Sequence, residues 1–261
     1  MELSLNSKVE LNNGVKIPRL GFGTWELARQ FAFDPVKWAL EKGYRLIDTA
    51  AIYANEKYVG KAIKESKIPR DEIFITSKVW NTDQGYEKTL KAFDESLSRL
   101  ELIYLDLYLI HWPNKLSIET WKALEQIYRE GKAKAIGVSN FTIKDLEKII
   151  KEYEIVPAIN QIKMHPLKFS ENKDLIDFCQ KKDIKIEAYS PLTHGENLDY
   201  KKFKEIAEKY NKTVPQILIR WSLQHGFICI PRSSNKEHID NNVNIFDFQL
   251  SEQEMMLLNS I

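Results

Sequence analysis

The chain has 261 residues, a length that suits one barrel domain of alternating strands and helices. Hydrophobic residues make up 43% and charged residues 29%, which provides a substantial core and excludes a disordered chain. Thirty-eight basic residues against 37 acidic ones leave a net charge of +1 without a basic stripe, so neither nucleic acid nor a membrane is expected as a partner.

Eight short apolar runs alternate with longer helix-like segments along the chain. The expected strands are residues 17–23, 44–48, 72–78, 106–111, 133–139, 157–162, 184–190 and 227–232. Continuous apolar runs without strict alternation are typical of parallel strands that are buried on both faces.

Signals for helix starts and ends lie between these runs. Asp34 before Pro35 predicts an N-cap followed by a first-turn proline. Two pairs have the spacing of capping boxes, Thr142 with Asp145 and Ser251 with Glu254. Three glycines fall where helices should end: Gly43, Gly131 and Gly226. Two further helices are expected at residues 199–210 and 213–225.

Eight strands alternating with helices fit either a closed eightfold barrel or an open doubly wound sheet. The open nucleotide-binding sheet usually carries G-x-G-x-x-G after its first strand, whereas GFGTWE at residues 21–26 lacks the third glycine. The strand count and the length favour the barrel. We therefore predict one α/β domain, a (β/α)8 TIM barrel spanning residues 1–261.

The start of the chain lacks the layout of a signal peptide, and no apolar run reaches the roughly 18 residues that a membrane span needs. The two cysteines, Cys179 and Cys229, are unclustered, which predicts neither a disulfide framework nor a zinc site. The five histidines show no H-E-x-x-H spacing, so no metal site is expected. We expect a cytoplasmic protein.

Polar and aromatic residues follow the expected strands, at the end of the barrel where active sites form. They are Asp48, Tyr53, Lys78, Trp80, His111, Trp112, Ser139, Asn140, Gln161, Tyr189 and Ser190. Taken alone, an aspartate here is commonly a cap, a lysine a solvated strand end, and a histidine a hydrogen-bonded structural residue. Four chemically complementary residues at three successive strand ends instead indicate a site.

These four residues together indicate carbonyl chemistry. A tyrosine has a pKa of about 10, and a nearby ammonium group favours the phenolate and lowers that pKa. Asp48 can hold Lys78 charged beside Tyr53, and His111 can hydrogen-bond the oxygen that Tyr53 protonates. The set predicts a general acid for a developing alkoxide, so a bound hydride donor is required.

The sequence resembles the aldo-keto reductases, which are nicotinamide-dependent barrel enzymes. The residues that match the signatures of this family, in order, are 43–60, 107–113, 134–141, 157–166 and 230–242. The resemblance implies a tetrad of Asp48, Tyr53, Lys78 and His111. Tyr53 would donate the proton, Lys78 would lower the pKa of Tyr53, and Asp48 would pair with Lys78, while His111 would orient the carbonyl.

The resemblance also implies an NADPH site. Ser139, Asn140 and Gln161 would hold the nicotinamide carboxamide, and Tyr189 would stack on the ring. The remaining positions expected to border the cofactor are Gly23, Thr24, Trp25, Ser190, Leu192, Arg232, Ser233, Ser234, His238 and Asn242. Arg232 suits the 2′-phosphate because its planar fork can bind two oxygens. His238 replaces an arginine common in the family, and Asn241 replaces a common glutamate, which leaves NADH use open.

The expected substrate is a small-molecule carbonyl compound. By the resemblance, Trp25, Trp80, His111 and Trp112 would line its pocket. Short loops at residues 114–117 and 193–199 indicate the compact microbial type, similar to 2,5-diketo-D-gluconate and methylglyoxal reductases. Such an open site suits aldehydes, ketones and dicarbonyls, and family precedent favours a monomer.

The sequence leaves two other functions open. A Schiff-base aldolase could use Lys78, but that chemistry needs a lysine of depressed pKa without a carboxylate partner. A non-catalytic nucleotide-binding protein of the same fold would have no need for Tyr53 and Lys78 together. Turnover of a simple aldehyde would separate these alternatives.

Overall fold

The computed structural model describes residues 3–261, in which eight parallel strands form one sheet in the order β3-β4-β5-β6-β7-β8-β9-β10. The strands are β3 (Phe22–Gly23), β4 (Leu46–Asp48), β5 (Phe74–Val79), β6 (Leu105–Ile110), β7 (Ala133–Ser139), β8 (Ile159–Lys163), β9 (Lys185–Tyr189) and β10 (Ile228–Cys229). Leu20 pairs in parallel with Cys229, and the Gly21 amide donates to the Cys229 carbonyl at 2.9 Å. This pairing joins the two edges of the sheet, so the predicted barrel is confirmed.

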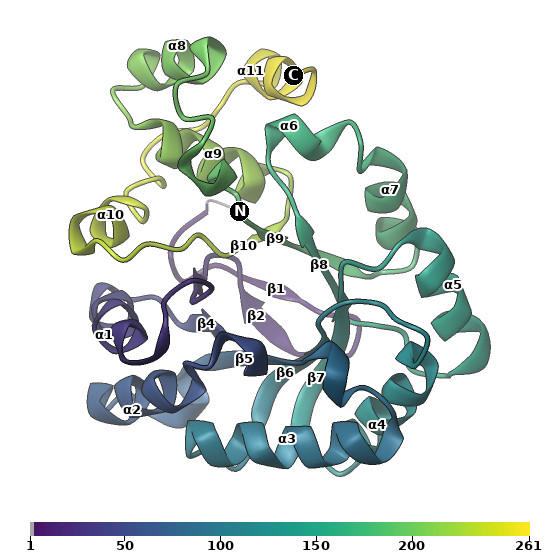
Figure 1. Ribbon diagram of the computed structural model, residues 1–261. Helices are drawn as coiled ribbons and strands as arrows, with labels where there is room; N and C mark the ends of the chain where they lie inside the picture. Colours follow the sequence, from purple (N-terminus) through teal and green to yellow (C-terminus); the bar gives the residue numbers. More distant parts are fainter. Residues whose placement is uncertain (1–2) are drawn as a thin grey trace.

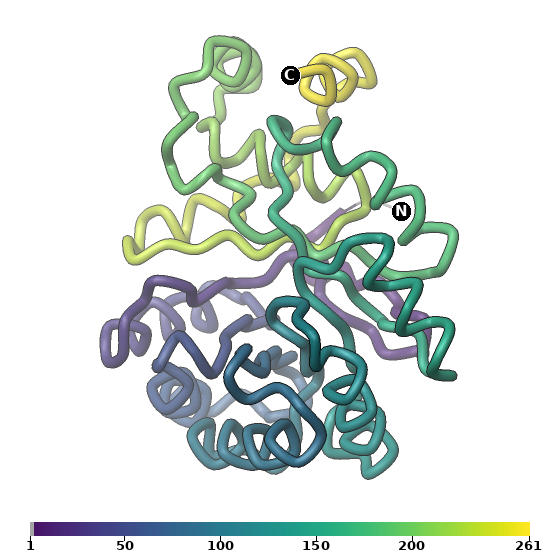
Figure 2. Tube along the Cα trace, turned by 45° about the vertical axis from the view of Figure 1, so that its right-hand side comes forward, coloured from purple at the N-terminus to yellow at the C-terminus, as the bar shows by residue number. Residues whose placement is uncertain are grey.

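Helices surround the ring of strands (Figure 1). They are α1 (Phe33–Lys42), α2 (Glu56–Ser66), α3 (Tyr86–Leu100), α4 (Ser117–Arg129), α5 (Ile143–Glu152), α6 (Pro166–Phe169), α7 (Lys173–Lys181), α8 (Lys201–Lys209), α9 (Val214–Gln224), α10 (Lys236–Asn241) and α11 (Glu252–Asn259). Figures 1 and 2 place α11 beside α6 and α8, which it contacts. Within residues 3–261, no helix is long and apolar enough to cross a membrane.

The apolar core has two parts because the strands are buried on both faces. Every residue of β5 and β6 is buried. The larger part of the core lies between the sheet and the helices, and the smaller part fills the barrel around Leu46, Leu107 and Ile159. Burial at about 25 cal/mol per Å² of apolar surface makes this continuous packing the main force that holds the strand ends in register.

An antiparallel hairpin of β1 (Lys8–Glu10) and β2 (Lys16–Pro18) precedes the barrel. Leu11 and Ile17 from this hairpin pack into the apolar cluster inside the barrel. The prediction of a single strand at residues 17–23 was therefore wrong. The start of this segment belongs to β2 and pairs with β1, and only Phe22–Gly23 enters the barrel.

Most of the predicted helix signals are confirmed. Thr142 and Ser251 both accept hydrogen bonds in complete capping boxes. Gly43 has φ 106° at the end of α1, a left-handed conformation that glycine adopts readily. The N-cap assigned to Asp34 was wrong, since α1 begins at Phe33 after a 3-10 turn and Asp34 lies within its first turn.

Candidate active site

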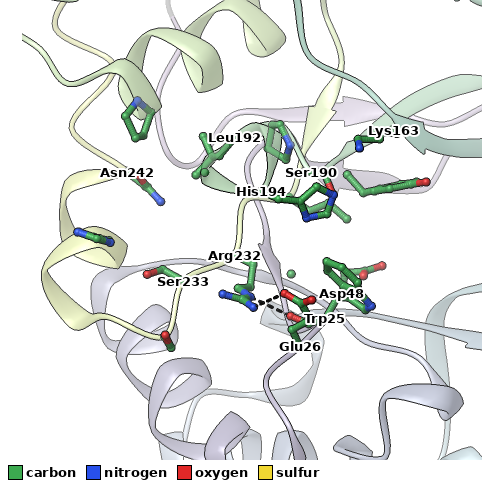
Figure 3. A pocket seen from close by; sticks show the side chains of 18 of the residues that line it. Trp25, Glu26, Asp48, Lys163, Ser190, Leu192, His194, Arg232, Ser233 and Asn242 are labelled. Atoms are coloured by element: carbon green, nitrogen blue, oxygen red, sulfur yellow. Dashed lines mark hydrogen bonds and ion pairs between the residues drawn. The ribbon is translucent and has the colours of Figure 1, made fainter. Parts of the chain in front are cut away.

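A cavity of about 840 Å³ opens at the C-terminal ends of the strands, lined by segments that follow most of them. Most of the residues expected to form the site lie on its wall. These are Gly23, Trp25, Asp48, Tyr53, His111, Trp112, Ser139, Asn140, Gln161, Tyr189, Ser190, Leu192, Arg232, Ser233, Ser234, His238 and Asn242. The strand-end rule therefore located the cavity, and Figure 3 shows part of its wall.

Three expected residues are not among those that line the cavity. Lys78 is fully buried, and the fully buried Thr24 donates its hydroxyl to the Asp48 carbonyl at 2.9 Å. Trp80 packs edge-on against the His111 ring at 5.1 Å between centroids. Trp80 thus contacts a wall residue, and its direct contact with substrate remains a prediction.

A buried ion pair joins the ends of β4 and β5. The Nζ of Lys78 lies 2.6 Å from Oδ1 of Asp48 and donates to the Thr49 carbonyl at 2.9 Å. Burial alone would lower the pKa of Lys78, but the Asp48 carboxylate raises it above its ordinary value. Lys78 therefore carries a fixed positive charge inside the barrel.

Tyr53 ends a 3-10 turn after β4 and lies against this ammonium group. Its ring centroid is 5.2 Å from the Nζ of Lys78, and its hydroxyl is 3.5 Å from Nε2 of His111. Burial raises the pKa of Tyr53, and this effect outweighs the lowering by Lys78. Lys78 thus acts in the expected direction, but the net pKa of Tyr53 is raised where the sequence predicted a lowered one.

His111 is a neutral imidazole in this site. Burial, and then the charge of Lys78, lower its pKa to about 3. Its Nδ1 atom is buried and has no hydrogen-bond partner among residues 3–261. Since Nε2 is the nitrogen near Tyr53, it is the ring atom available to a substrate oxygen at that point.

Amide and hydroxyl groups after β7 and β9 form a connected row beside these residues. Asn140 donates to the His111 carbonyl at 3.1 Å and to the Ser139 hydroxyl at 3.0 Å. The Tyr189 hydroxyl donates to Oδ1 of Asn140 at 2.9 Å. Asn140 has φ 63° and Ser190 has φ 49°, so both hold left-handed conformations that are uncommon for such residues and cluster at functional sites.

Gln161 connects this row to the ion pair and reveals a residue that the sequence analysis missed. Its Nε2 donates to Oδ2 of Asp48 at 2.9 Å and to Oε2 of Glu187 at 2.7 Å. Glu187 is fully buried in β9, and burial followed by the charge of Asp48 raises its pKa to about 8. A carboxylate in the middle of the apolar run IKIEAYS was the signal that could have identified it.

Contacts that the sequence analysis also missed join two segments of the cavity wall, the one after β3 and the one after β10. Arg232 donates from Nη2 to Glu26 at 2.7 Å and from Nε to the Trp25 carbonyl at 2.9 Å. Figure 3 shows Arg232 between Ser233 and Asn242 on one side and Trp25 and Asp48 on the other. His194 packs edge-on against Trp25 at 5.1 Å, so the segment after β9 also contacts Trp25.

The strand ends of this closed parallel barrel carry a phenol, an imidazole and a buried ammonium–carboxylate pair. This combination defines a barrel enzyme with a site for carbonyl chemistry. Residues 19–261 match the model of the Aldo/keto reductase family, and the chain belongs to this family of oxidoreductases. It is 51% identical to the glyoxal reductase of Bacillus subtilis over 257 residues, which is 98% of this chain and 92% of that protein.

Solved structures agree with this assignment. An aldo/keto reductase from Brucella melitensis has a TM-score of 0.93 at 48% identity, with 97% of this chain and 98% of that chain covered. An aldo-keto reductase of Bombyx mori, solved in complex with NADP, has a TM-score of 0.91 at 35% identity, with 99% and 93% covered.

Proposed function

We propose that this protein reduces aldehydes, ketones or dicarbonyls to alcohols with NADPH, and that Tyr53 donates the proton. The observation that carries the proposal is the geometry around Tyr53. Its hydroxyl faces a neutral His111 at 3.5 Å at the cavity wall, while its ring lies against the buried Lys78 ammonium. That arrangement suits a carbonyl oxygen that gains negative charge as it is reduced.

The cavity fits an extended dinucleotide with a 2′-phosphate. Ser139, Asn140 and Gln161 offer amide and hydroxyl groups beside the tetrad, and Arg232 and Ser233 line the same cavity after β10. The guanidinium of Arg232 can bind a phosphate by two parallel hydrogen bonds. The structural relative bound to NADP supports this choice. When bound, NADPH supplies the hydride.

In the proposed reaction, Nε2 of His111 donates a hydrogen bond to the substrate carbonyl and directs its oxygen toward Tyr53. The raised pKa of Tyr53 keeps its hydroxyl protonated at neutral pH, so it is ready to donate. The proton moves from the Tyr53 hydroxyl to the substrate oxygen as negative charge develops there. Lys78 stabilises the resulting phenolate, and Asp48 keeps Lys78 charged and in place.

The structure weakens the aldolase alternative. A Schiff-base lysine must be available as a neutral amine, whereas Lys78 has a raised pKa and a carboxylate partner at 2.6 Å. A binding-only protein remains the functional alternative that turnover has to exclude. The cytoplasmic location and the monomeric state remain predictions.

The test is oxidation of NADPH and NADH, followed at the nicotinamide absorbance. The panel contains glyoxal, methylglyoxal, phenylglyoxal, nitrobenzaldehyde, a keto sugar and a 2-keto ester. The identity to a protein named glyoxal reductase leads us to expect the dicarbonyls to react fastest. Cofactor binding without turnover of any member of the panel would favour the binding-only protein.

Two variants test the assigned roles. Tyr53→Phe should lose most turnover and keep its affinity for NADPH, because the ring remains and only the acid is removed. Arg232→Ala should weaken NADPH far more than NADH, and equal losses for both would remove the case for a phosphate contact. If the Tyr53→Phe enzyme turned over at the rate of the wild type, Tyr53 would not be the acid.

A further inference from the structure

Glu187 is a buried acid for which the proposed reaction has no use. Glu187 is 0% exposed, and its Oε1 atom has no hydrogen-bond partner within residues 3–261. Its other oxygen accepts one bond, from Gln161 at 2.7 Å. A buried carboxyl with a single partner is costly compared with an apolar side chain of the same size, so its place in β9 calls for an explanation.

The barrel places Glu187 directly beside Gln161. The two residues are opposite each other in the pairing of β8 with β9, so their side chains point to the same face. Asp48 reaches the same amide from β4 on another part of the barrel. Gln161 is thus held between two carboxyl groups that come from strands far apart in the sequence.

A glutamine amide has two N–H donors and one carbonyl oxygen. In Gln161, Nε2 donates to both Asp48 and Glu187, so both donors are taken. Turning the amide over would place its oxygen against the Asp48 carboxylate, which is repulsive. The carbonyl oxygen Oε1 is consequently the polar atom of Gln161 that is left for a ligand in the cavity.

We propose that Glu187 is a positioning residue that, together with Asp48, fixes the Gln161 amide so that its oxygen selects a ligand carrying an N–H donor. Under the proposed function, on which this inference rests, that ligand group is the carboxamide N–H2 of nicotinamide. Glu187 then acts through Gln161 and touches neither the substrate nor the cofactor.

The charges around Glu187 suit this role. Burial, and then the charge of Asp48, raise its pKa to about 8, while Gln161 and Lys78 act in the opposite direction. At neutral pH the carboxyl is therefore mostly protonated. It still accepts at Oε2 when the proton is on Oε1, and it adds no second full charge beside Asp48. Tyr53 and Cys229 are the other titratable groups that sense it.

The test compares two ligands that differ in this one donor. NADP⁺ carries the carboxamide, whereas 3-acetylpyridine adenine dinucleotide phosphate has a methyl group in place of the N–H2. A third ligand, 2′,5′-ADP, reports on the adenosine end alone. Dissociation constants are measured by quenching of tryptophan fluorescence for wild type, Glu187→Met and Glu187→Gln. Methionine keeps the volume and removes the acceptor, whereas glutamine keeps an oxygen that can accept from Gln161.

We expect wild type to bind NADP⁺ about five-fold more tightly than the acetylpyridine analogue, the size of one net hydrogen bond. In Glu187→Met this ratio should fall, because Asp48 alone then holds the Gln161 amide and its oxygen is positioned less firmly. Glu187→Gln should restore most of the ratio. All three proteins should bind 2′,5′-ADP equally, which a general loss of structure would not allow.

The inference would be overturned if Glu187→Met kept the wild-type ratio of affinities for NADP⁺ and the acetylpyridine analogue. It would also be overturned if this ratio fell as far in Glu187→Gln as in Glu187→Met. Should Glu187→Met fail to bind 2′,5′-ADP, Glu187→Leu makes the same comparison with another side chain that lacks an acceptor. A wild-type ratio of one, with normal turnover of NADPH, would remove the inference and leave the proposed function intact. Absence of dinucleotide binding and turnover in wild type would instead remove the proposed function.

Discussion

The buried pair of Lys78 and Asp48 allows a quantitative prediction for Asp48→Asn. Both side chains are almost inaccessible, with exposures of 0% and 4%. Asparagine retains an oxygen that can accept from Lys78, but it leaves the ammonium without its counter-charge. Breaking a buried pair from one side costs about 3–5 kcal/mol. We expect the free energy of unfolding to fall by about 3 kcal/mol, the lower end of that range.

The lower end is expected because Glu187 can take over part of the role of Asp48. Burial, and then the charge of Asp48, raise the pKa of Glu187, so removal of the Asp48 charge should lower that pKa and favour an ionised Glu187 near Lys78. Asp48→Asn combined with Glu187→Gln should therefore lose about 5 kcal/mol, the upper end of the range. Glu187→Gln alone should cost little, since the carboxyl that it replaces is mostly neutral.

The assay is equilibrium unfolding in urea at pH 7, followed by tryptophan fluorescence, for the wild type, both single variants and the double variant. The double variant should lose about 2 kcal/mol more than the sum of the single losses, because the two sites interact through Lys78. Additive losses would show that Glu187 does not compensate. An Asp48→Asn protein as stable as wild type would show that Lys78 does not depend on Asp48 for its charge.

Three other changes have distinct expected outcomes. Glu26→Gln should release Arg232 from its exposed ion pair and tighten NADPH binding up to about five-fold, while the affinity for NADH stays constant. Fluorescence titrations with both cofactors measure this, and equal changes for both would contradict it. Glu254 has a pKa lowered to about 2, since hydrogen bonds from partners that include Lys209 outweigh burial. Ionised Glu254 therefore contributes to the free energy of unfolding above its unfolded-state pKa, near 4.3. This contribution is lost as the pH falls through the folded-state pKa of about 2. Glu254→Gln should cost roughly 3 kcal/mol at pH 7 and less than half of that at pH 3 in urea titrations, and an equal loss at both values would exclude the assigned cause. Gly60→Ala would place a methyl group against the Leu100 backbone carbonyl, so the free energy of unfolding should fall by about 2–3 kcal/mol in calorimetry. An unchanged melting temperature would mean that α2 and α3 can separate freely.

The parts of the site that were predictable depend on local patterns. Asp48 and Lys78 are strand residues, and His111 directly follows a strand, so the alternation of strands and helices was enough to bring them to one end of the barrel. The two confirmed capping boxes are also local, since each depends on residues three positions apart. Asp34 had a similar local signal and failed, because a preceding 3-10 turn shifted the helix start to Phe33.

The parts that were not predictable depend on contacts between distant segments. Arg232 and Glu26 are 206 positions apart, and no local pattern indicates that their side chains meet. Trp80 lies in an extended conformation beyond β5, and its edge-on contact with His111 depends on how the loop that follows β5 folds. Glu187 lies in an apolar run that predicts a strand but does not predict what the carboxyl faces inside the barrel.

The raised pKa of Tyr53 changes how the effect of Lys78 is understood. Under the proposed function Tyr53 donates the proton, so it must be protonated before the reaction, and burial favours that form at neutral pH. A net lowering of the pKa toward 7 would instead leave part of the enzyme as phenolate, which cannot donate. In the proposed mechanism Lys78 contributes most after the proton has moved, when a phenolate would lie beside its buried charge. Its stabilisation is therefore larger in the transition state than in the ground state, which is the condition for accelerating the chemical step.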